Sequence, residues 1–446
     1  MLDIRFVREN SALVKKDLKK RRDSEKLGWV DELLKMDKDY REALQEAESL
    51  RAKRNELTEQ MTKLIAQKKT TIVKNSNIGG GNYKKSRSSP KQLDLITESK
   101  KITEKIKNAE NEAAPLKEKI DWFLMRLPNV LHDSVPAGKD SSENVVVRES
   151  GKKVSRPELA PHGEILEKNG WADFTRAAKV AGAGFYFLKG RFALLDIALQ
   201  RFALDRLISK GYTLIEPPFL MNREAYSGVT DLADFENVMY KIDSEDLYLI
   251  ATSEHPMAAM FRDEILPEEK LPIKFAGLSP CFRREIGKHG IDTRGIFRVH
   301  QFNKIEQFIF CKPQDSWKFH EELLKNAEEI FSDLGLACRV VNICTGDIGI
   351  VAAKKYDLEV WMPRESEYRE VVSCSNCTSY QAVRSNIKFR LKDGSKEYVH
   401  TLNSTAVATS RALRAIVETH YEDGAIKIPK ALQPYMNGAK EILPEN

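Results

Sequence analysis

The sequence has no hydrophobic run long enough to cross a membrane as a helix. Its start, MLDIRFVRENSALVKKDLKK, mixes acids with bases and lacks the apolar core of a signal peptide. Six cysteines in 446 residues are too few and too scattered for a disulfide framework, which indicates reduced thiols. With 41% hydrophobic and 31% charged residues, the composition is that of a soluble globular protein. We therefore expect a cytoplasmic protein with no membrane partner.

The loops that usually hold nucleotide phosphates are also missing. No GxxxxGK[ST] segment occurs, and GGGNYKKS at 79–86 fails the pattern because no glycine directly precedes its lysine pair. No strand, glycine-rich turn and helix follow one another as a dinucleotide site requires. If this chain binds phosphates, it must use side chains on a sheet. Arginine suits that task because its planar fork binds two oxygens at once.

Acidic residues are absent from Met61 to Leu93. Basic residues gather there instead: Lys63, Lys68, Lys69, Lys74, Lys84, Lys85, Arg87 and Lys91. Two interpretations fit this segment. It is either a solvated loop or the basic tip of a rigid arm that reaches a phosphate backbone.

Two heptad patterns flank this basic tip. In residues 91–127 the repeat steps by four and three through Leu95, Ser99, Ile102, Ile106, Ala109, Ala113, Leu116, Ile120, Phe123 and Leu127. An earlier stretch keeps a similar repeat at Leu33, Tyr40, Leu44, Ala47, Leu57, Met61 and Leu64. The glycine-rich segment 70–90 between them predicts a turn, so the two helices form an antiparallel coiled-coil hairpin. We expect residues 1–127 to be a helical domain that carries this long arm.

A second domain follows a change in composition. Residues 128–158 are rich in Pro, Ser and Gly and predict a linker. From 159 to 446, amphipathic helices such as 192–211 alternate with short strand-like runs such as TLIEPPFL and DLEVWM. Loops join many of these runs, which favours an α+β domain with an antiparallel β-sheet flanked by helices over a doubly wound parallel sheet.

One stretch of the second domain, FRREIGKHGIDTRGIFRVHQFNKIEQF at 282–308, alternates charged and aromatic residues on two predicted strands. A hairpin with a solvated charged face is one interpretation. A floor on which arginines bind phosphates and an aromatic ring stacks on a base is the other. The rest of the chain decides between them.

FRRE at 282–285 and RGIFRVHQFNKIEQF at 294–308 resemble motif 2 of class II aminoacyl-tRNA synthetases, in the form found in seryl-tRNA synthetases. GYTLIEPPFL at 211–220 is similar to motif 1, and LYLIATSEHP at 247–256 to the TxE serine loop. REVVSCSNCTSYQAVR at 369–384 resembles the segment before motif 3, and residues 400–432 resemble motif 3 itself. With the N-terminal hairpin the likeness spans nearly the whole chain, and it indicates an archaeal-type, non-zinc form of this family.

The resemblance implies ATP-dependent ligation of L-serine to serine tRNA through a seryl-adenylate, with release of AMP and pyrophosphate. It implies catalytic roles for Arg283, Glu285 and Arg411. The residues implied for ATP are Arg283, Arg284, Glu285, Val299, Phe302, Glu370, Val371, Val372, Ser373 and Arg411. Those implied for serine are Thr252, Ser253, Glu254, Arg283, Glu306 and Thr405. Glu370 and Ser373 would also hold Mg²⁺, which prefers oxygen ligands.

The resemblance further implies a homodimer and a coiled coil that grips the long variable arm of serine tRNA. The residues expected on tRNA are Lys68, Lys69, Lys74, Lys84, Lys85, Arg87 and Arg294. Selenocysteine tRNA is expected to be charged with serine as well where it is present. Cys374 and Cys377 have the spacing of a zinc knuckle, but no second pair follows them, so no zinc is expected.

Two alternatives stay open from the sequence. One is an enzyme of the same class that uses a different small amino acid, such as threonine, alanine or cysteine. The other is a synthetase-like binding protein with an inactive site, although Arg283, Glu370 and Arg411 are all present. A pure coiled-coil scaffold leaves residues 160–440 unexplained.

Overall fold

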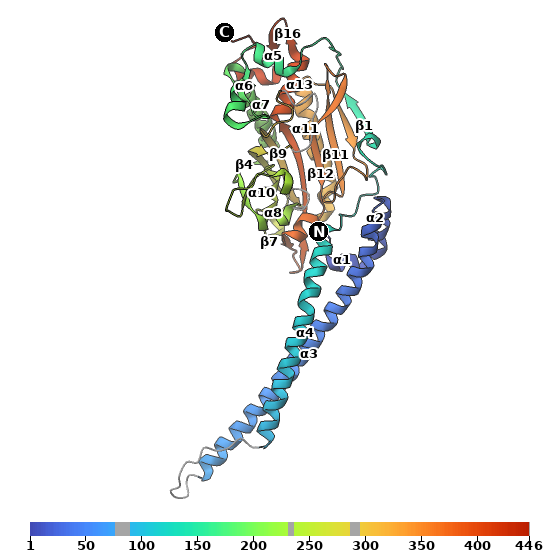
Figure 1. The fold of residues 1–446 in the computed structure, drawn as a ribbon, viewed down its shortest axis with the longest axis vertical. Coiled ribbons are helices and arrows are strands. Elements are labelled where there is room, and N and C mark those ends of the chain that lie inside the picture. The colour runs from blue at the N-terminus through green and yellow to red at the C-terminus, as the bar shows by residue number, and fades with distance from the viewer. Residues whose placement is uncertain (76–89, 231–235, 286–294, 446) are drawn as a thin grey trace. The chain divides into compact units, whose positions relative to one another are not determined.

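The structure, a computed structural model, describes residues 1–75, 90–230, 236–285 and 295–445, and of residues 67–75 only the helical backbone (Figure 1). Its contacts divide the chain into two compact units. Unit 1 comprises residues 1–3, 20–22 and 126–446, and unit 2 comprises residues 4–19 and 23–125. Each unit is described by itself below.

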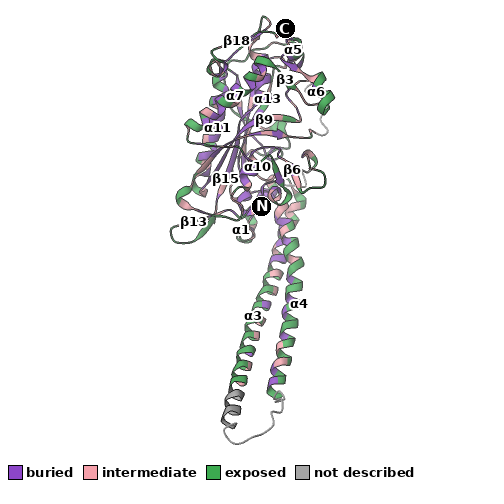
Figure 2. Cartoon of the chain, turned by 90° about the vertical axis from the view of Figure 1, so that its left-hand side faces the viewer, coloured by how far each residue is buried: buried purple, intermediate pink, exposed green. Residues whose placement is uncertain are grey.

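Unit 2 is helical and consists mainly of α1 (Ile4–Glu9), α2 (Ser11–Lys20), α3 (Ser24–Asn75) and α4 (Pro90–Arg126). The predicted seam of α4 is confirmed, because the apolar residues at its three-four spacing are buried: Leu95, Ile102, Ile106, Ala109, Ala113, Ile120 and Phe123. Figure 2 shows this buried stripe along α4 between exposed flanks. Burial of an apolar stripe is what holds two such helices together.

The matching stripe of α3 differs from the prediction at one position. Leu57 is buried, and Met61 and Leu64 pack on the cluster that it forms with residues of α4. Leu44, however, is 38% exposed, so its place in the seam was wrong. An α-helix has 3.6 residues per turn, so a stripe read with a 3.5-residue repeat drifts away from the contact line. The helix also continues to Asn75, into the segment predicted as a turn.

Unit 1 is built around an eight-stranded sheet. Its strands, in spatial order, are β1 (Val145–Ser150), β10 (Cys338–Asn342), β11 (Lys354–Met362), β12 (Glu367–Asn376), β15 (His400–Ala408), β9 (Gln301–Cys311), β8 (Ile273–Phe282) and β4 (Thr213–Ile215). All neighbouring pairs are antiparallel except β4 and β8. The predicted α+β class with an antiparallel sheet is therefore confirmed.

The remaining elements surround this sheet (Figure 1). The helices are α5 (His162–Lys168), α6 (Phe174–Ala181), α7 (Gly190–Ser209), α8 (Arg223–Val229), α10 (Glu254–Ala259), α11 (Ser316–Asp333), α12 (Tyr380–Arg384) and α13 (Thr409–His420). The smaller sheets consist of β2 (Ala172–Asp173) and β3 (Phe187–Leu188), β5 (Leu220–Asn222) and β6 (Leu247–Leu249), β7 (Ile265–Pro267), β13 (Lys388–Arg390) and β14 (Lys396–Tyr398), and β16 (Tyr421–Glu422), β17 (Ala425–Lys427) and β18 (Glu441–Ile442). None of the described helices combines the length and hydropathy of a membrane span.

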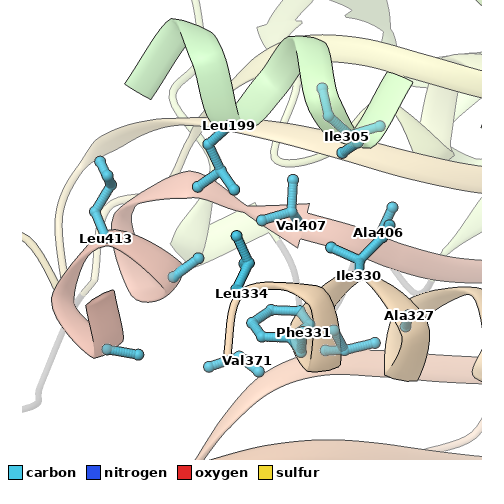
Figure 3. Close-up of a cluster of buried hydrophobic side chains, with 14 of the residues drawn as sticks. Leu199, Ile305, Ala327, Ile330, Phe331, Leu334, Val371, Ala406, Val407 and Leu413 are labelled. Carbon is cyan, nitrogen blue, oxygen red and sulfur yellow. The ribbon is translucent and has the colours of Figure 1, made fainter. Parts of the chain in front are cut away.

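Helices α7, α11 and α13 cover one face of the sheet with an apolar core. Figure 3 shows Leu199 of α7, Phe331 of α11 and Leu413 of α13 converging on strand residues such as Ile305 and Val407. None of these five residues is more than 1% exposed. Because one face of each central strand is committed to this core, alternate residues must point to the opposite face.

Two β-bulges, one in β12 and one in β15, interrupt this alternation and change which side chains point to the opposite face. The register of β12 with β11 passes from Val372 to Glu370 and skips Val371. The register of β15 with β9 passes from Thr405 to Val407 and skips Ala406. An extra residue in one strand re-aims the side chains on either side of it. Both bulged residues remain in the apolar core.

The segment 128–158, for which the composition predicts a linker, contains β1. This strand pairs with β10 at the edge of the main sheet from Val145 to Ser150. Its six residues are all exposed, which explains why the segment lacks the apolar pattern of a core strand. Arg148 of β1 is held by Glu328 of α11 through two hydrogen bonds of 2.6 and 2.8 Å.

We predict that one buried ion pair in this core contributes far more to stability than a surface pair. Arg414 of α13 is 2% exposed and donates to Glu418 at 2.8 Å and to Glu365. Arg414→Ala leaves the buried Glu418 carboxylate without its cation and Glu365 with Arg369 alone, and it should destabilise the protein by about 3–5 kcal/mol. Lys427→Ala, which breaks an exposed pair with Glu441, should cost less than about 1 kcal/mol.

Urea unfolding followed by tryptophan fluorescence compares the two variants. Equal midpoints for Arg414→Ala and Lys427→Ala would show that the buried pair has no special structural weight.

Candidate active site

A cavity of about 450 Å³ lies on the face of the sheet opposite the α7–α11–α13 core. Strands β9, β12 and β15 supply its floor, and α10 and the loop 348–352 supply its walls. The volume is in the range of small-molecule sites. The lining includes Thr252, Glu254, Arg283, Phe302, Lys304, Glu306, Lys355, Glu370, Val371, Ser373, Asn403, Thr405 and Arg411.

Strand β9 places every second side chain in the cavity: Phe302, Lys304 and Glu306. Lys304 Nζ lies 2.7 Å from Glu306 Oε2, and the two side chains are only 6% and 2% exposed. Thr405 lies opposite Glu306 on β15, and its hydroxyl donates to Glu306 Oε2 at 3.1 Å. This corner of the cavity is therefore a small polar pocket whose hydrogen-bonding groups are fixed before a ligand arrives.

Thr252 and Glu254, at the start of α10, face this pocket from above the floor. The backbone N–H of Glu254 donates to Thr252 Oγ1 at 3.1 Å, and Gln381 of α12 donates to Glu254 Oε1 at 3.3 Å. Burial, together with the nearby charge of Glu306, raises the pKa of Glu254 to about 7. A buried carboxyl with such a pKa is suited to receive a cation from a ligand.

Arg283, just beyond the end of β8, reaches the other half of the cavity. Its Nε donates to the Ala251 carbonyl at 3.3 Å, and its guanidinium lies 5.3 Å from the centre of the Phe302 ring. The rest of the guanidinium is available for an anion, and Phe302 offers an aromatic face.

Glu370 and Arg411 meet at the far end of the cavity. Arg411 donates to the Glu370 carbonyl at 2.9 Å, and its guanidinium lies 3.3 Å from the Glu370 carboxylate. Desolvation raises the pKa of Glu370, but the charges of Arg411, Lys355 and Arg283 outweigh it and lower the pKa overall. Glu370 is therefore an anion in the free protein.

The bulge in β12 explains how Glu370 and Ser373 share the cavity. Residues three apart on a regular strand point to opposite faces, but the extra residue at Val371 brings both to one face. An ionised carboxylate beside a hydroxyl is a donor set that suits Mg²⁺ when phosphate oxygens complete its shell. The residues present therefore fit the metal ion that the sequence predicted.

Five of the described residues predicted for the site do not line this cavity. The Ser253 hydroxyl is buried and donates to the Gly277 carbonyl at 3.4 Å, and the Arg284 backbone N–H donates to the Val238 carbonyl at 2.9 Å. Val372 points into the apolar core. The other two are Glu285, which has a positive φ of 44°, and Val299, which is 2% exposed.

Sequence reasoning missed several cavity residues that the period of the strands could have revealed. Lys304 stands two residues from both Phe302 and Glu306, so it must share their face. Asn403 stands in the same relation to Thr405. Lys355 of β11 is different, because only the folded structure shows that it reaches the cavity. Its Nζ lies 3.4 Å from Asp357 Oδ1, and it is also near the charge of Glu370.

Of the three histidines expected to be loop or packing residues, His300 packs as expected, whereas His255 packs on an aromatic ring and also lines the cavity. His255 is 4% exposed and packs edge-on against Tyr226, and burial lowers its pKa to about 3. His300 stacks on Phe185 and shares a 2.6 Å hydrogen bond with Tyr240. His289 lies outside the described residues.

All six cysteines are buried and free. Among the described residues, no group of three or more His, Cys, Asp or Glu side chains is arranged to hold a metal ion.

The residues predicted to contact tRNA fall mostly outside the described part of the chain. Lys84, Lys85, Arg87 and Arg294 are not described. Lys68, Lys69 and Lys74 belong to the last turns of α3, where only the backbone is described.

Comparison with known proteins gives consistent results. Residues 238–420 match the family model of the tRNA synthetase class II core domain (G, H, P, S and T), and residues 1–79 match that of the seryl-tRNA synthetase N-terminal domain. A serine–tRNA ligase from Methanocella arvoryzae is 58% identical over 99% of this chain and 100% of its own length.

Solved structures agree over the full length. Seryl-tRNA synthetase from Pyrococcus horikoshii, complexed with ATP, is 47% identical with a TM-score of 0.88, and 100% of each chain is covered. Cytoplasmic serine–tRNA ligase from Naegleria fowleri, in complex with AMP, is 35% identical with a TM-score of 0.84, covering 100% of this chain and 99% of that one. The chain therefore belongs to the seryl-tRNA synthetase family of class II aminoacyl-tRNA synthetases, in its archaeal type.

Proposed function

We propose that this chain ligates L-serine to serine tRNA in two steps that share the cavity described above. The observation that carries this proposal is the division of one cavity into two halves. An arginine and aromatic half suits ATP, and a small carboxylate pocket suits a serine ammonium and hydroxyl. Family membership supplies the reaction, and the geometry supports the roles that we propose for the residues.

In the first step a serine carboxylate oxygen bonds to the α-phosphorus of ATP, and the bond to the bridging oxygen breaks as pyrophosphate leaves. In the second step a terminal hydroxyl of tRNA attacks the seryl carbonyl, and AMP leaves. Both reactants are anions in the first step, so positioning and charge neutralisation carry most of the rate. Arg283 neutralises the α-phosphate and serine carboxylate, and Arg411 holds the far phosphates. Phe302 stacks on adenine.

Glu370 and Ser373 would hold Mg²⁺ on the phosphates. The ion, when bound, supplies further neutralisation of the leaving pyrophosphate. The free-state pair of Arg411 and Glu370 would then separate, because Arg411 turns to phosphate oxygens and Glu370 to the cation. Of the ATP set, Arg284, Glu285, Val299 and Val372 would act through the backbone or from the cavity's edge.

Serine recognition falls to the four polar residues around the small pocket: Thr252, Glu254, Glu306 and Thr405. Glu254 faces the ammonium group, while Glu306 and Thr405, already joined at 3.1 Å, read the hydroxyl. A site built to hydrogen-bond a hydroxyl rejects alanine because its buried polar groups stay unpaired. Ser253 supports this loop from below through Gly277.

We assign residues 1–127 to tRNA binding, 159–446 to catalysis, and 128–158 to the connection between them. The basic tip gives the arm an electrostatic contact with the backbone of a long variable arm, which needs no base readout. Recognition of backbone shape would also admit selenocysteine tRNA where it is present. Arg294, in the motif 2 loop, would contact tRNA near the site.

We further propose a cytoplasmic homodimer without a membrane partner. Apolar side chains are exposed along α7 and the neighbouring edge strand β4, with Ile197 at 60%, Ile208 at 45% and Leu214 at 47%. This surface includes motif 1 and resembles a face that a second subunit covers.

Amino-acid-dependent exchange of pyrophosphate into ATP tests the proposed chemistry first. Each standard amino acid is supplied separately to the purified protein, and serine alone should support strong exchange. Arg283→Ala should lower that exchange by about 100-fold or more, since it removes charge stabilisation of the transition state. Exchange with another amino acid would overturn the pocket assignment. No exchange in a folded protein that binds tRNA would identify a binding module.

The pKa of Glu254, raised to about 7, predicts the pH dependence of serine binding. Below that pH the Glu254 carboxyl is protonated and cannot pair with the serine ammonium, so kcat/KM for serine should fall about tenfold per pH unit. Above it the value should level off.

The Glu254→Gln variant controls for this assignment. It should bind serine weakly at every pH and lose the inflection near neutrality. The KM for ATP serves as the internal reference. A parallel change of both KM values with pH would place the titrating group elsewhere.

Deletion of residues 68–90 tests the arm. Pyrophosphate exchange should stay near the wild-type rate, while transfer of serine to tRNA should fall by about tenfold or more through loss of phosphate contacts. Lys105→Ala and Lys107→Ala, which remove exposed lysines of α4 outside the basic tip, are the matched controls. Equal loss of exchange and transfer in the deletion would contradict a role confined to tRNA.

A further inference from the structure

Cys377 lines the cavity, although no role follows for it from the chemistry above. It comes directly after β12, in the alternation that brings Ser373 and Ser375 to the same face. Its side chain is only 2% exposed. The thiol therefore forms part of the inner surface of the site and not of the outer surface of the protein.

The backbone of Cys377 is fixed on two sides. Its N–H donates to the Thr401 carbonyl at 3.0 Å, and its carbonyl accepts from Asn129 Nδ2 at 2.9 Å. The side chain is also held, because Asn403 Nδ2 donates to its Sγ at 3.6 Å. A group anchored at three points cannot move away easily to make room for a larger ligand.

The sheet register places Asn403, which holds this thiol, in the row next to the residues proposed to read the hydroxyl. Thr405 pairs with Glu306 in one row of the floor, and Asn403 pairs with Ser375 in the next row. Asn403 reaches Cys377 past the end of β12. The pocket thus has hydroxyl readers in one row and an end wall of Asn403 and Cys377 behind them.

The thiol in this wall is neutral. Burial and the nearby charge of Glu254 raise the pKa of Cys377 well above its ordinary value. A neutral, buried thiol is neither a nucleophile nor a metal ligand, and it behaves as a small apolar group.

We propose that Cys377, backed by Asn403, is the specificity-determining residue that excludes threonine by volume. This inference rests on the proposed serine pocket. Threonine carries the same ammonium, carboxylate and hydroxyl as serine, so Glu254, Glu306 and Thr405 cannot reject it by hydrogen bonding. The extra methyl group of threonine is the only difference. It can be rejected only by steric conflict with a side chain that cannot move away.

The reaction that the wall prevents is the activation of threonine. A threonine carboxylate oxygen would bond to the α-phosphorus of ATP, pyrophosphate would leave, and threonyl-adenylate would form. Discrimination by one methyl group in a packed pocket is worth about 10–200-fold. Removing the Cys377 side chain should therefore reduce the discrimination against threonine by a comparable factor.

Cys377→Ala tests this directly in pyrophosphate exchange with serine and with threonine. The ratio of kcat/KM for serine to that for threonine should fall by about tenfold or more, mainly through a lower KM for threonine. Cys377→Ser, close to cysteine in volume, should preserve most of the ratio. Cys374→Ala is the matched control, since Cys374 is a buried thiol of the same strand that points into the apolar core.

Cys377→Val provides a second test that does not depend on the stability of the alanine variant. Its branched side chain extends the wall, so the KM for serine should rise several-fold while the KM for ATP stays the same. An unchanged ratio in Cys377→Ala, or an unchanged KM for serine in Cys377→Val, overturns the proposal. If the wild-type protein shows no serine exchange, the proposed function itself has failed, which is a separate outcome.

Discussion

The two-residue period of β9, β12 and β15 is the constraint on which the rest of this protein depends. One face of these strands is committed to the apolar core with α7, α11 and α13, so only the other face can supply strand side chains to the cavity. A regular strand offers only every second residue to that face. The bulges at Val371 and Ala406 relax this limit, and they let Glu370 join Ser373 and Ala408 join Thr405 in the cavity.

A cavity built this way collects opposite charges at close range. Lys304 with Glu306, and Arg411 with Glu370, are pairs in the free protein. Lys304 and Glu306 are buried together, and burying either member alone would be costly. Both pairs also hold their charged groups in a fixed orientation at the cavity, which is the kind of arrangement that stabilises charge without further reorganisation.

Prediction from the sequence succeeded where a repeat or a motif carries the information. The heptads of α4 predicted most of its buried seam, although Ser99 and Leu116 are only half-buried, and on α3 Leu44 is exposed. The resemblance gave Arg283, Phe302, Glu306, Thr405 and Arg411, which the fold brings into one cavity. Lys304 was within reach of a simple period-two argument. The same argument, counted from Ser373, reaches Ser375 and Cys377. Lys355 was not predictable in this way, because the pairing of β11 with β12 brings it to the cavity and a single sequence does not show that pairing.

The bulged residues also tie the stability of the core to the geometry of the site. Val371 and Ala406 belong to the same apolar cluster as Phe331 and Leu413 (Figure 3). Their neighbours Glu370 and Thr405 line the cavity. A core substitution that straightened either bulge would turn an essential side chain out of the cavity without touching it. Core residues that do not line the cavity are therefore constrained by its geometry. A closely packed interior transmits small displacements, because it has little free space to absorb them.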